Sequence, residues 1–382
     1  MNLLNRLSIF SLICLTMLSI CGCDSSSDSV VEDTTTTDTV VQRTVYLLSN
    51  ASGTNSVLAY TRDSAGGLTF SSETPTGGSG SGDDLGSSGG SIVLDTNTGL
   101  LYCVNAGSNS ISLFYVYTDG TIALLDTQNT RGVRPISIAV DYDTVYVLNA
   151  GDADNAPTIA GFTVLDGAMY FIEDSNQSLD STDALPTQIA FAPAGGVLAV
   201  SESGSDQITS FVLDSNYAAY YKSSVTSAGL GPAGIDFTPG GVMLCAEINE
   251  ALDGGGSVSS YSLSSLGDIS AISSSATNGA TSTTGIKVFS SGSNAVVSNS
   301  GSDNLSWYGI GSDGQVSYTG ADFEAGDEPR EVILSENDEY LYVLNRGSDS
   351  ISAYAVDESG NTLTALSGVS GLPATTIGLT GW

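Results

Sequence analysis

The chain has 382 residues, and its 42 acidic side chains outnumber its 9 basic ones to give a formal net charge of −33. This balance excludes nucleic acid and anionic lipid headgroups as partners of the folded part, because both require clustered Lys and Arg. The chain contains no His and 45 Gly, so chemistry that depends on an imidazole is excluded along its whole length.

The first 22 residues predict an export signal. Arg6 provides a short basic start, and the apolar stretch over 7–20 is too short for a typical membrane-spanning helix. The stretch ends in Ile20-Cys21-Gly22-Cys23, which resembles the bacterial lipoprotein box, in which a small residue precedes the Cys that receives the lipid. The resemblance implies cleavage after Gly22 and lipidation of Cys23. An ordinary cleaved signal, or cleavage at Cys21, are the alternatives.

Residues 23–42 are rich in Ser, Thr and Asp. Such a segment cannot bury a core, so we expect a disordered acidic tether between the lipidated Cys23 and a folded part over 43–382. The protein is then expected to be held at a bacterial membrane, on the periplasmic or cell-surface face, through its lipid alone.

A Gly-Ser-Asn/Asp phrase recurs along the rest of the chain, each time between two strand-like apolar runs. The copies lie at 107–112, 204–209, 301–306 and 347–352. Many units open with a Pro before an apolar run, and Pro is tolerated there because the first residue of a strand need not donate to the ladder. These openings are at Pro135, Pro186, Pro232, Pro329 and Pro373. Four short antiparallel strands per period are the pattern of one β-propeller blade.

The two ends of the repeat region each carry part of a blade. The segment over 43–74 has three later strands but no opening strand, and the segment over 372–382 has only an opening. We therefore predict an all-β, seven-bladed β-propeller in which the C-terminal strand closes the ring against the N-terminal segment. Residues 43–382 then provide about 49 residues per blade, in the range of propeller repeats. Six or eight blades, a two-sheet sandwich and a β-helix are the alternatives.

Two internal features indicate no site by themselves. Cys103 and Cys245 occupy comparable places in nonadjacent blades, and we interpret both as small buried hydrophobic residues. The acidic loop Asp152-Ala153-Asp154-Asn155 has alternating oxygen ligands but lacks the later Glu of a full Ca²⁺ loop, so an ordinary acidic turn is favoured. We expect no metal and no cofactor.

The stretch over 329–345, which opens Pro329-Arg330-Glu331 and ends at Asn345, resembles the repeat of the seven-bladed lactonase propellers. That family includes the propeller type of 6-phosphogluconolactonase and the carboxymuconate-lactonising enzymes. The resemblance covers about 43–382 and implies a site of His, Arg and Glu at one mouth of the channel. Here the family's His position holds Glu331, and the Glu position after Asn345 holds Arg346. The equivalent openings hold Ser137, Gln188, Gly234 and Thr375, so the family's usual general base is absent.

Glu331 and Arg330 are the candidate catalytic residues, since a carboxylate beside a cation can act as an acid or base near a developing oxyanion. The favoured alternative is that Glu331 and Arg346 pair across neighbouring strands. Arg131 and Arg134 open the third blade, and with Arg346 they are the candidate ligand-binding residues for a carboxylate or a sugar phosphate.

The sequence therefore supports two hypotheses. In the first, a lipid-anchored envelope propeller of the lactonase type binds a small anionic or sugar-derived ligand at the channel mouth, as a monomer. Lactone hydrolysis stays open in this hypothesis but is doubtful, because the family's His is absent. In the second, the propeller is a non-catalytic interaction or adhesion platform of the envelope. The two are separated by whether the four arginines and Glu331 lie at one face of the ring.

Overall fold

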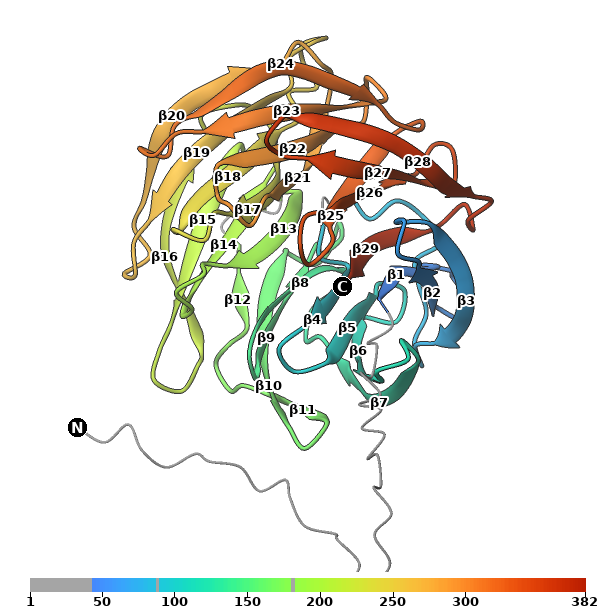
Figure 1. The fold of residues 1–382 in the computed structure, drawn as a ribbon. Coiled ribbons are helices and arrows are strands. Elements are labelled where there is room, and N and C mark those ends of the chain that lie inside the picture. Colours follow the sequence, from blue (N-terminus) through green and yellow to red (C-terminus); the bar gives the residue numbers. More distant parts are fainter. Residues whose placement is uncertain (1–42, 87–88, 180–182) are drawn as a thin grey trace, which may run out of the picture. The chain divides into compact units, whose positions relative to one another are not determined.

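The computed structural model of the protein describes residues 43–86, 89–179 and 183–382. The predicted signal, the lipidation site Cys23 and the tether lie outside the described residues. The described part is a ring of seven antiparallel sheets, as Figure 1 shows. Within it, no helix is long and apolar enough to cross a membrane.

The ring is closed by a composite blade, as the incomplete end repeats predict. Its sheet runs in the order β29-β1-β2-β3. The strands are β1 (Thr44–Leu48), β2 (Ser56–Arg62), β3 (Leu68–Pro75) and β29 (Ile377–Gly381). β29 pairs antiparallel with β1, with Tyr46 opposite Thr380. The C-terminal strand thus takes the innermost place of the first blade.

The other six blades follow in chain order, each running from an innermost to an outermost strand. Blades two and three contain β4 (Ile92–Asp95), β5 (Leu100–Asn105), β6 (Ser110–Val116) and β7 (Ile122–Asn129), then β8 (Pro135–Asp141), β9 (Thr144–Asn149), β10 (Thr158–Leu165), β11 (Ala168–Phe171) and the short β12 (Gln177–Ser178). Blades four and five contain β13 (Pro186–Phe191), β14 (Val197–Glu202), β15 (Gln207–Leu213) and β16 (Ala219–Thr226), then β17 (Pro232–Phe237), β18 (Val242–Glu247), β19 (Ser257–Leu263) and β20 (Ile269–Thr277). Blades six and seven contain β21 (Thr283–Val288), β22 (Asn294–Asn299), β23 (Asn304–Ile310) and β24 (Val316–Glu324), then β25 (Pro329–Leu334), β26 (Tyr340–Asn345), β27 (Ser350–Asp357) and β28 (Thr362–Ser370).

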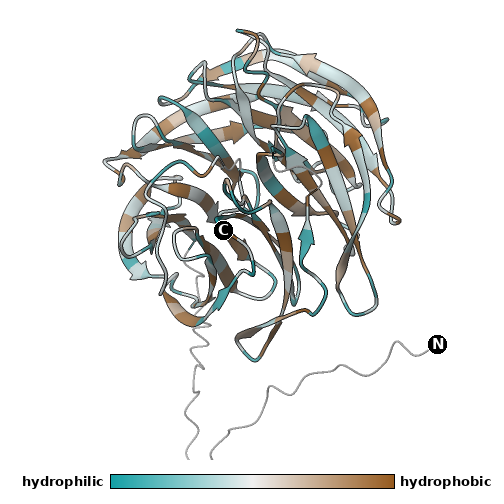
Figure 2. Cartoon of the chain, turned by 180° about the vertical axis from the view of Figure 1, so that it is seen from behind, coloured by the Kyte–Doolittle hydropathy of each residue, from teal (hydrophilic) through white to brown (hydrophobic). Residues whose placement is uncertain are grey.

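The core lies between the faces of neighbouring blades. The second and third strands are almost wholly buried, whereas the outermost strands, such as β7 and β28, alternate exposed and half-buried residues. Figure 2 shows the same gradient, with most hydrophobic residues on the inner strands and paler outer strands. Sheets that are covered on both faces need such continuous apolar runs, which is why the second strands read as nearly unbroken hydrophobic segments.

A repeated tyrosine on the second strand links each of several blades to the next. Tyr46, Tyr146 and Tyr342 are fully buried. The hydroxyls donate to carbonyl oxygens in the next blade, of Gly120 at 2.9 Å, Tyr217 at 2.7 Å and Gly66 at 2.8 Å. Burying an aromatic ring while pairing its hydroxyl is the favourable way to place a tyrosine in a core.

The recurring phrase forms the turn between the second and third strands. Its Asn or Asp has a positive φ in every copy: 53° at Asn109, 54° at Asp206, 53° at Asp303 and 47° at Asp349. Asn and Asp tolerate this left-handed region better than other residues that carry a Cβ. In three copies the side chain also accepts a hydrogen bond from the backbone that leads into the next blade, at Arg134, Gly231 and Glu328.

Candidate functional site

The innermost strands are linked to one another at the position where the family resemblance expects His. Ser137 accepts from the backbone N–H of Ile189 in the next blade at 3.3 Å. Gln188 exchanges two hydrogen bonds with the backbone of Ile235, at 3.1 and 3.0 Å. At Gly285 the neighbouring strand approaches so closely that a Cβ would lie 2.1 Å from the carbonyl oxygen of Arg330. In this chain the position holds the ring together.

Glu331 occupies the same position and holds the closing strand. Its two carboxylate oxygens accept the backbone N–H groups of Gly378 and Leu379 on β29, at 3.0 and 3.1 Å. The residue is 5% exposed. Burial raises the pKa of Glu331 to about 7, although the two N–H donors favour the charged form.

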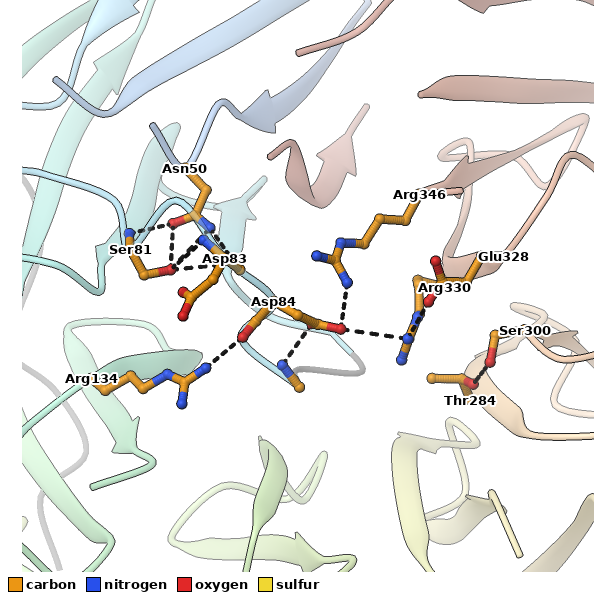
Figure 3. Close-up of polar contacts among 11 residues, drawn as sticks. Asn50, Ser81, Asp83, Asp84, Arg134, Thr284, Ser300, Glu328, Arg330 and Arg346 are labelled. Carbon is orange, nitrogen blue, oxygen red and sulfur yellow. Dashed lines mark hydrogen bonds and ion pairs between the residues drawn. The ribbon is translucent and has the colours of Figure 1, made fainter. Parts of the chain in front are cut away.

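Three of the four candidate arginines converge at the end of the channel where the innermost strands begin. Arg134 precedes β8, Arg330 is the second residue of β25, and Arg346 directly follows β26. All three meet Asp84, in the loop between β3 and β4, as Figure 3 shows. Residues from blades three and seven therefore form one cationic cluster around the loop between blades one and two, which we call the arginine mouth (Arg134, Arg330 and Arg346).

The contacts of the arginine mouth use both the side chain and the backbone of Asp84. Arg134 Nη2 donates to its carbonyl oxygen at 2.5 Å, Arg330 Nη2 lies 3.5 Å from Oδ2, and Arg346 Nη1 pairs with the same Oδ2. Arg330 Nη2 also pairs with Glu328 Oε1 at 2.5 Å. Because a guanidinium carries five N–H donors, these contacts leave donors over for a further acceptor.

Two of these donors are buried without a partner. Arg330 Nε and Arg346 Nε have no hydrogen-bond acceptor among the described residues, and the two side chains are only 22% and 20% exposed. A buried polar group without a partner costs about 1–3 kcal/mol, and more when it belongs to a charged group. The arginine mouth therefore keeps two N–H donors that make no hydrogen bond among the described residues.

The loop that carries Asp84 is held in place by Asn50, two residues after the end of β1. Asn50 Nδ2 donates to the carbonyl oxygen of Asp83 at 2.9 Å, and its Oδ1 accepts the N–H of Ser81 at 2.9 Å. Burial disfavours ionisation of Asp84. The N–H of Gly86 and the charges of Arg330 and Arg346 outweigh this, so the pKa of its carboxyl is lowered.

Arg131 lies away from the arginine mouth. Its guanidinium stacks over the ring of Phe171 on β11, 5.0 Å from the centroid. Arg131 therefore does not join the other three arginines at Asp84, although it lies in the same turn as Arg134 and both residues have a positive φ, of 59° and 58°.

The favoured pairing of Glu331 with Arg346 is wrong. Arg346 pairs with Asp84, while both oxygens of Glu331 are used by β29. Thr375 is also not at the family's His position, because β29 begins only at Ile377. Its hydroxyl donates to the carbonyl oxygen of Ser49 instead, at 2.6 Å.

The cysteines and the acidic loop have local explanations. Cys103 and Cys245 are free and fully buried, and burial raises the pKa of both thiols, as expected of packing residues. Asp152 accepts the N–H groups of Asp154 and Asn155 at 3.0 and 2.9 Å, so its carboxylate caps its own turn. Nowhere in the described ranges do three His, Cys, Asp or Glu side chains gather as a metal site requires.

Sequence reasoning missed two kinds of residue. Asp84 has no periodic pattern around it that would place its side chain. Glu202 and Glu247 end the second strands of blades four and five, where other blades have Asn, and both are buried. Because Glu202 and Glu247 align with Asn105 and Asn345 in the repeat, this departure from Asn is the sequence feature that could have identified them. Burial raises the pKa of Glu247, and its carboxylate accepts from Ser257, Ser227 and Gly229.

Comparison with known proteins places this architecture in a family. The family model described as lactonase, 7-bladed beta-propeller, matches residues 86–376. No curated protein matches the sequence significantly.

Among solved structures, the fold resembles a proposed 6-phosphogluconolactonase of Bacteroides fragilis (TM-score 0.67, 19% identity, 92% of this chain and 100% of that one). It also resembles the periplasmic gluconolactonase of Pseudomonas aeruginosa (TM-score 0.70, 15% identity, 88% and 99% covered). A protein of unknown function from Desulfotomaculum acetoxidans is similar too (TM-score 0.71, 14% identity, 89% and 98% covered). At such identities the structural likeness concerns the fold alone. With the family model matched over most of its length, the chain belongs to the seven-bladed β-propeller lactonase family.

Proposed function

We propose that this propeller binds a small anionic, sugar-derived ligand, such as a sugar acid or a sugar phosphate, at the arginine mouth. The observation that carries the proposal is the meeting of three guanidinium groups on the carboxylate and carbonyl of Asp84. Planar guanidinium groups match carboxylates and phosphates with paired N–H donors. Asp84 then stands where the anionic group of a ligand would bind.

The charge of the whole chain makes this cluster more significant. The chain has only 9 basic residues, against 42 acidic ones. Three of the basic residues meet at one place. A random distribution of arginines on such an acidic surface would pair them singly with neighbouring acids, as Lys222 pairs with Asp268 at 3.3 Å. The cluster instead concentrates positive potential at the channel entrance, where it can attract anions.

Lactone hydrolysis is the second candidate function. Glu331 lines the same small pocket as Arg330 and Arg346, and a pKa of about 7 suits a general base near neutral pH. Against it, the carboxylate already binds two backbone N–H groups, and the chain has no His. We therefore infer binding without turnover, and keep the interaction platform as the alternative for a protein that binds no such ligand.

A titration of the full chain with gluconate and 6-phosphogluconate, followed by calorimetry, tests the proposal. We expect binding that weakens with added salt, and a loss of about tenfold or more in Arg346→Met, because a charge-assisted hydrogen-bonded pair is worth about 1.5–3 kcal/mol. The matched control is Arg131→Met, which removes an arginine from the same face but outside the mouth. An equal loss in both variants, or no binding to the parent protein, would refute the proposal and favour the interaction platform.

The cellular setting is proposed from the first 23 residues. Cleavage after Gly22 and lipidation of Cys23 would tether the propeller at a membrane, where it meets ligands outside the cytoplasm. Incorporation of a labelled fatty acid in a bacterial host tests this. The label should be lost in Cys23→Ala and kept in Cys21→Ala; retention of the label in Cys23→Ala would refute lipidation at this residue.

A further inference from the structure

The channel widens at the end opposite the arginine mouth into a cavity of about 420 Å³. Residues from the innermost strands of all seven blades line it, including Val93, Ala190, Asp236, Lys287, Ile333 and Thr380. Ile333 lies three residues beyond Arg330 along β25, which corresponds to about 10 Å of strand. Glu331 is the one described residue that lines both this cavity and the pocket at the arginine mouth, so it marks the boundary between them.

The size and lining of the cavity suit a small molecule. Ligand pockets commonly measure about 300–1,000 Å³ and combine apolar walls with a few polar groups. Most of the residues that line the cavity are apolar in type, among them Val93, Ala190 and Ile333, which are only half-buried. Asp236 and Lys287 carry the charges on one side, from the neighbouring strands β17 and β21.

In this charged pair, Asp236 accepts several hydrogen bonds, whereas Lys287 has donors left over. Lys287 Nζ lies 3.0 Å from Asp236 Oδ2. The carboxylate of Asp236 also accepts the N–H groups of Phe237 and Val288, both at 2.9 Å. Lys287 has three N–H donors, and Asp236 is its only acceptor among the described residues. Any polar group of a ligand is therefore better placed to accept from Lys287 than to donate to Asp236.

The pair also restricts the chemistry of that ligand. Asp236 raises the pKa of Lys287, so the side chain stays an ammonium donor and is a poor nucleophile. Because Asp236 balances its charge and the chain as a whole carries −33, the cavity offers no net attraction to an anion. An uncharged acceptor is not repelled by the negative charge of the protein.

We propose that the wide end of the channel is a second binding site, for an uncharged, largely apolar molecule whose carbonyl oxygen accepts a hydrogen bond from Lys287. The site is separate from the arginine mouth and takes a different class of ligand. The apolar walls bury the body of the molecule, and Lys287 fixes its orientation.

Three probes of similar size test this by calorimetry on the full chain: 2-acetylnaphthalene with a carbonyl, 2-ethylnaphthalene without one, and 2-naphthoate with a charge. We expect the ketone to bind more tightly than either of the other two. In the double variant Lys287→Met, Asp236→Asn, which leaves no charge unpaired, ketone affinity should fall by about tenfold or more, to the level of the hydrocarbon. The control Lys222→Met, Asp268→Asn removes a comparable ion pair from the outer surface and should not change the affinity.

A cavity-filling variant provides an independent check, should the double variant fold poorly. Ala190→Phe places a ring in the cavity while leaving Lys287 and Asp236 unmutated, and should abolish binding of both the ketone and the hydrocarbon. The proposal is overturned if the ketone does not bind at millimolar concentration, if the hydrocarbon binds as tightly, or if 2-naphthoate binds best. Unchanged binding to Ala190→Phe would likewise overturn it.

Discussion

The Asn or Asp in the recurring turn is required both by the backbone conformation of the turn and by a side-chain hydrogen bond. Asn109 has φ of 53° and accepts the backbone N–H of Arg134 at 2.8 Å. It therefore satisfies two requirements of one turn, and through Arg134 it helps to position the arginine mouth. The same dual use at Asp206 and Asp303 explains why the phrase keeps Asn or Asp at this place.

Replacing Asn109 separates the two contributions. Asn109→Gly should lose the hydrogen bond but keep the conformation, whereas Asn109→Ala should lose the bond and also oppose the positive φ. The alanine variant is therefore expected to be less stable than the glycine variant by about 1 kcal/mol, measured by urea unfolding. Equal stability, or a more stable alanine variant, would show that the left-handed conformation carries no cost here.

At the scale of elements, the closing strand depends on a buried carboxylate. β29 joins β1 through a ladder with a register shift, and Glu331 on β25 binds two of its N–H groups from the other side. The position where the family resemblance expects His is thus part of the ring closure in this chain. Because Glu331 is buried with a raised pKa, the free energy of unfolding should depend on pH.

The pH dependence has a definite sign. Between about pH 4.5 and about pH 7 the folded protein keeps a proton on Glu331 that the unfolded chain has released. The folded state binds more protons in this window, so its stability should fall as pH rises, by an amount on the order of 3 kcal/mol. Urea unfolding of the parent protein and of Glu331→Gln, at both ends of the window, isolates this contribution. Any stability advantage of the parent protein over Glu331→Gln at low pH should shrink or reverse at high pH.

Glu336 is exposed, so Glu336→Gln is the control for the loss of one carboxylate. The parent protein, Glu331→Gln and Glu336→Gln have all other acidic residues in common. A parent protein and Glu331→Gln that respond to pH in parallel would contradict the assignment of a raised pKa to this buried group.

The elements also show how far sequence reasoning reaches. Repeat spacing and turn residues predict the blades, and the unmatched ends at 43–74 and 372–382 predict the closure, because both depend on local patterns. Side-chain partners across the ring depend on register between blades. Lys287 and Asp236 are 51 residues apart in a repeat whose opening at Thr284 lacks Pro, so their pairing could not be predicted. Asp84 lies in a Gly- and Ser-rich loop with no periodicity to orient it.

On the scale of the whole molecule, the propeller is a channel with two unlike ends. Three arginines face one entrance of a protein with a net charge of −33, while the other end is a mainly apolar cavity. The seven blades supply side chains from distant parts of the sequence to both ends, which is how one repeated unit can build two different sites. The seven-bladed fold of the family is kept, and at the position where the resemblance expects His the side chains of Ser137, Gln188 and Glu331 link neighbouring innermost strands.

The central claim is that the carboxylate of Asp84 occupies the place of an anionic ligand in the arginine mouth. The affinity of Asp84→Asn for gluconate, measured by calorimetry beside the parent protein, tests it most directly. Removing the competing charge while keeping the backbone carbonyl should raise the affinity by about tenfold, since charged hydrogen bonds in such a site are worth about 1.5–3 kcal/mol. An affinity that is unchanged or lower in Asp84→Asn would contradict the account.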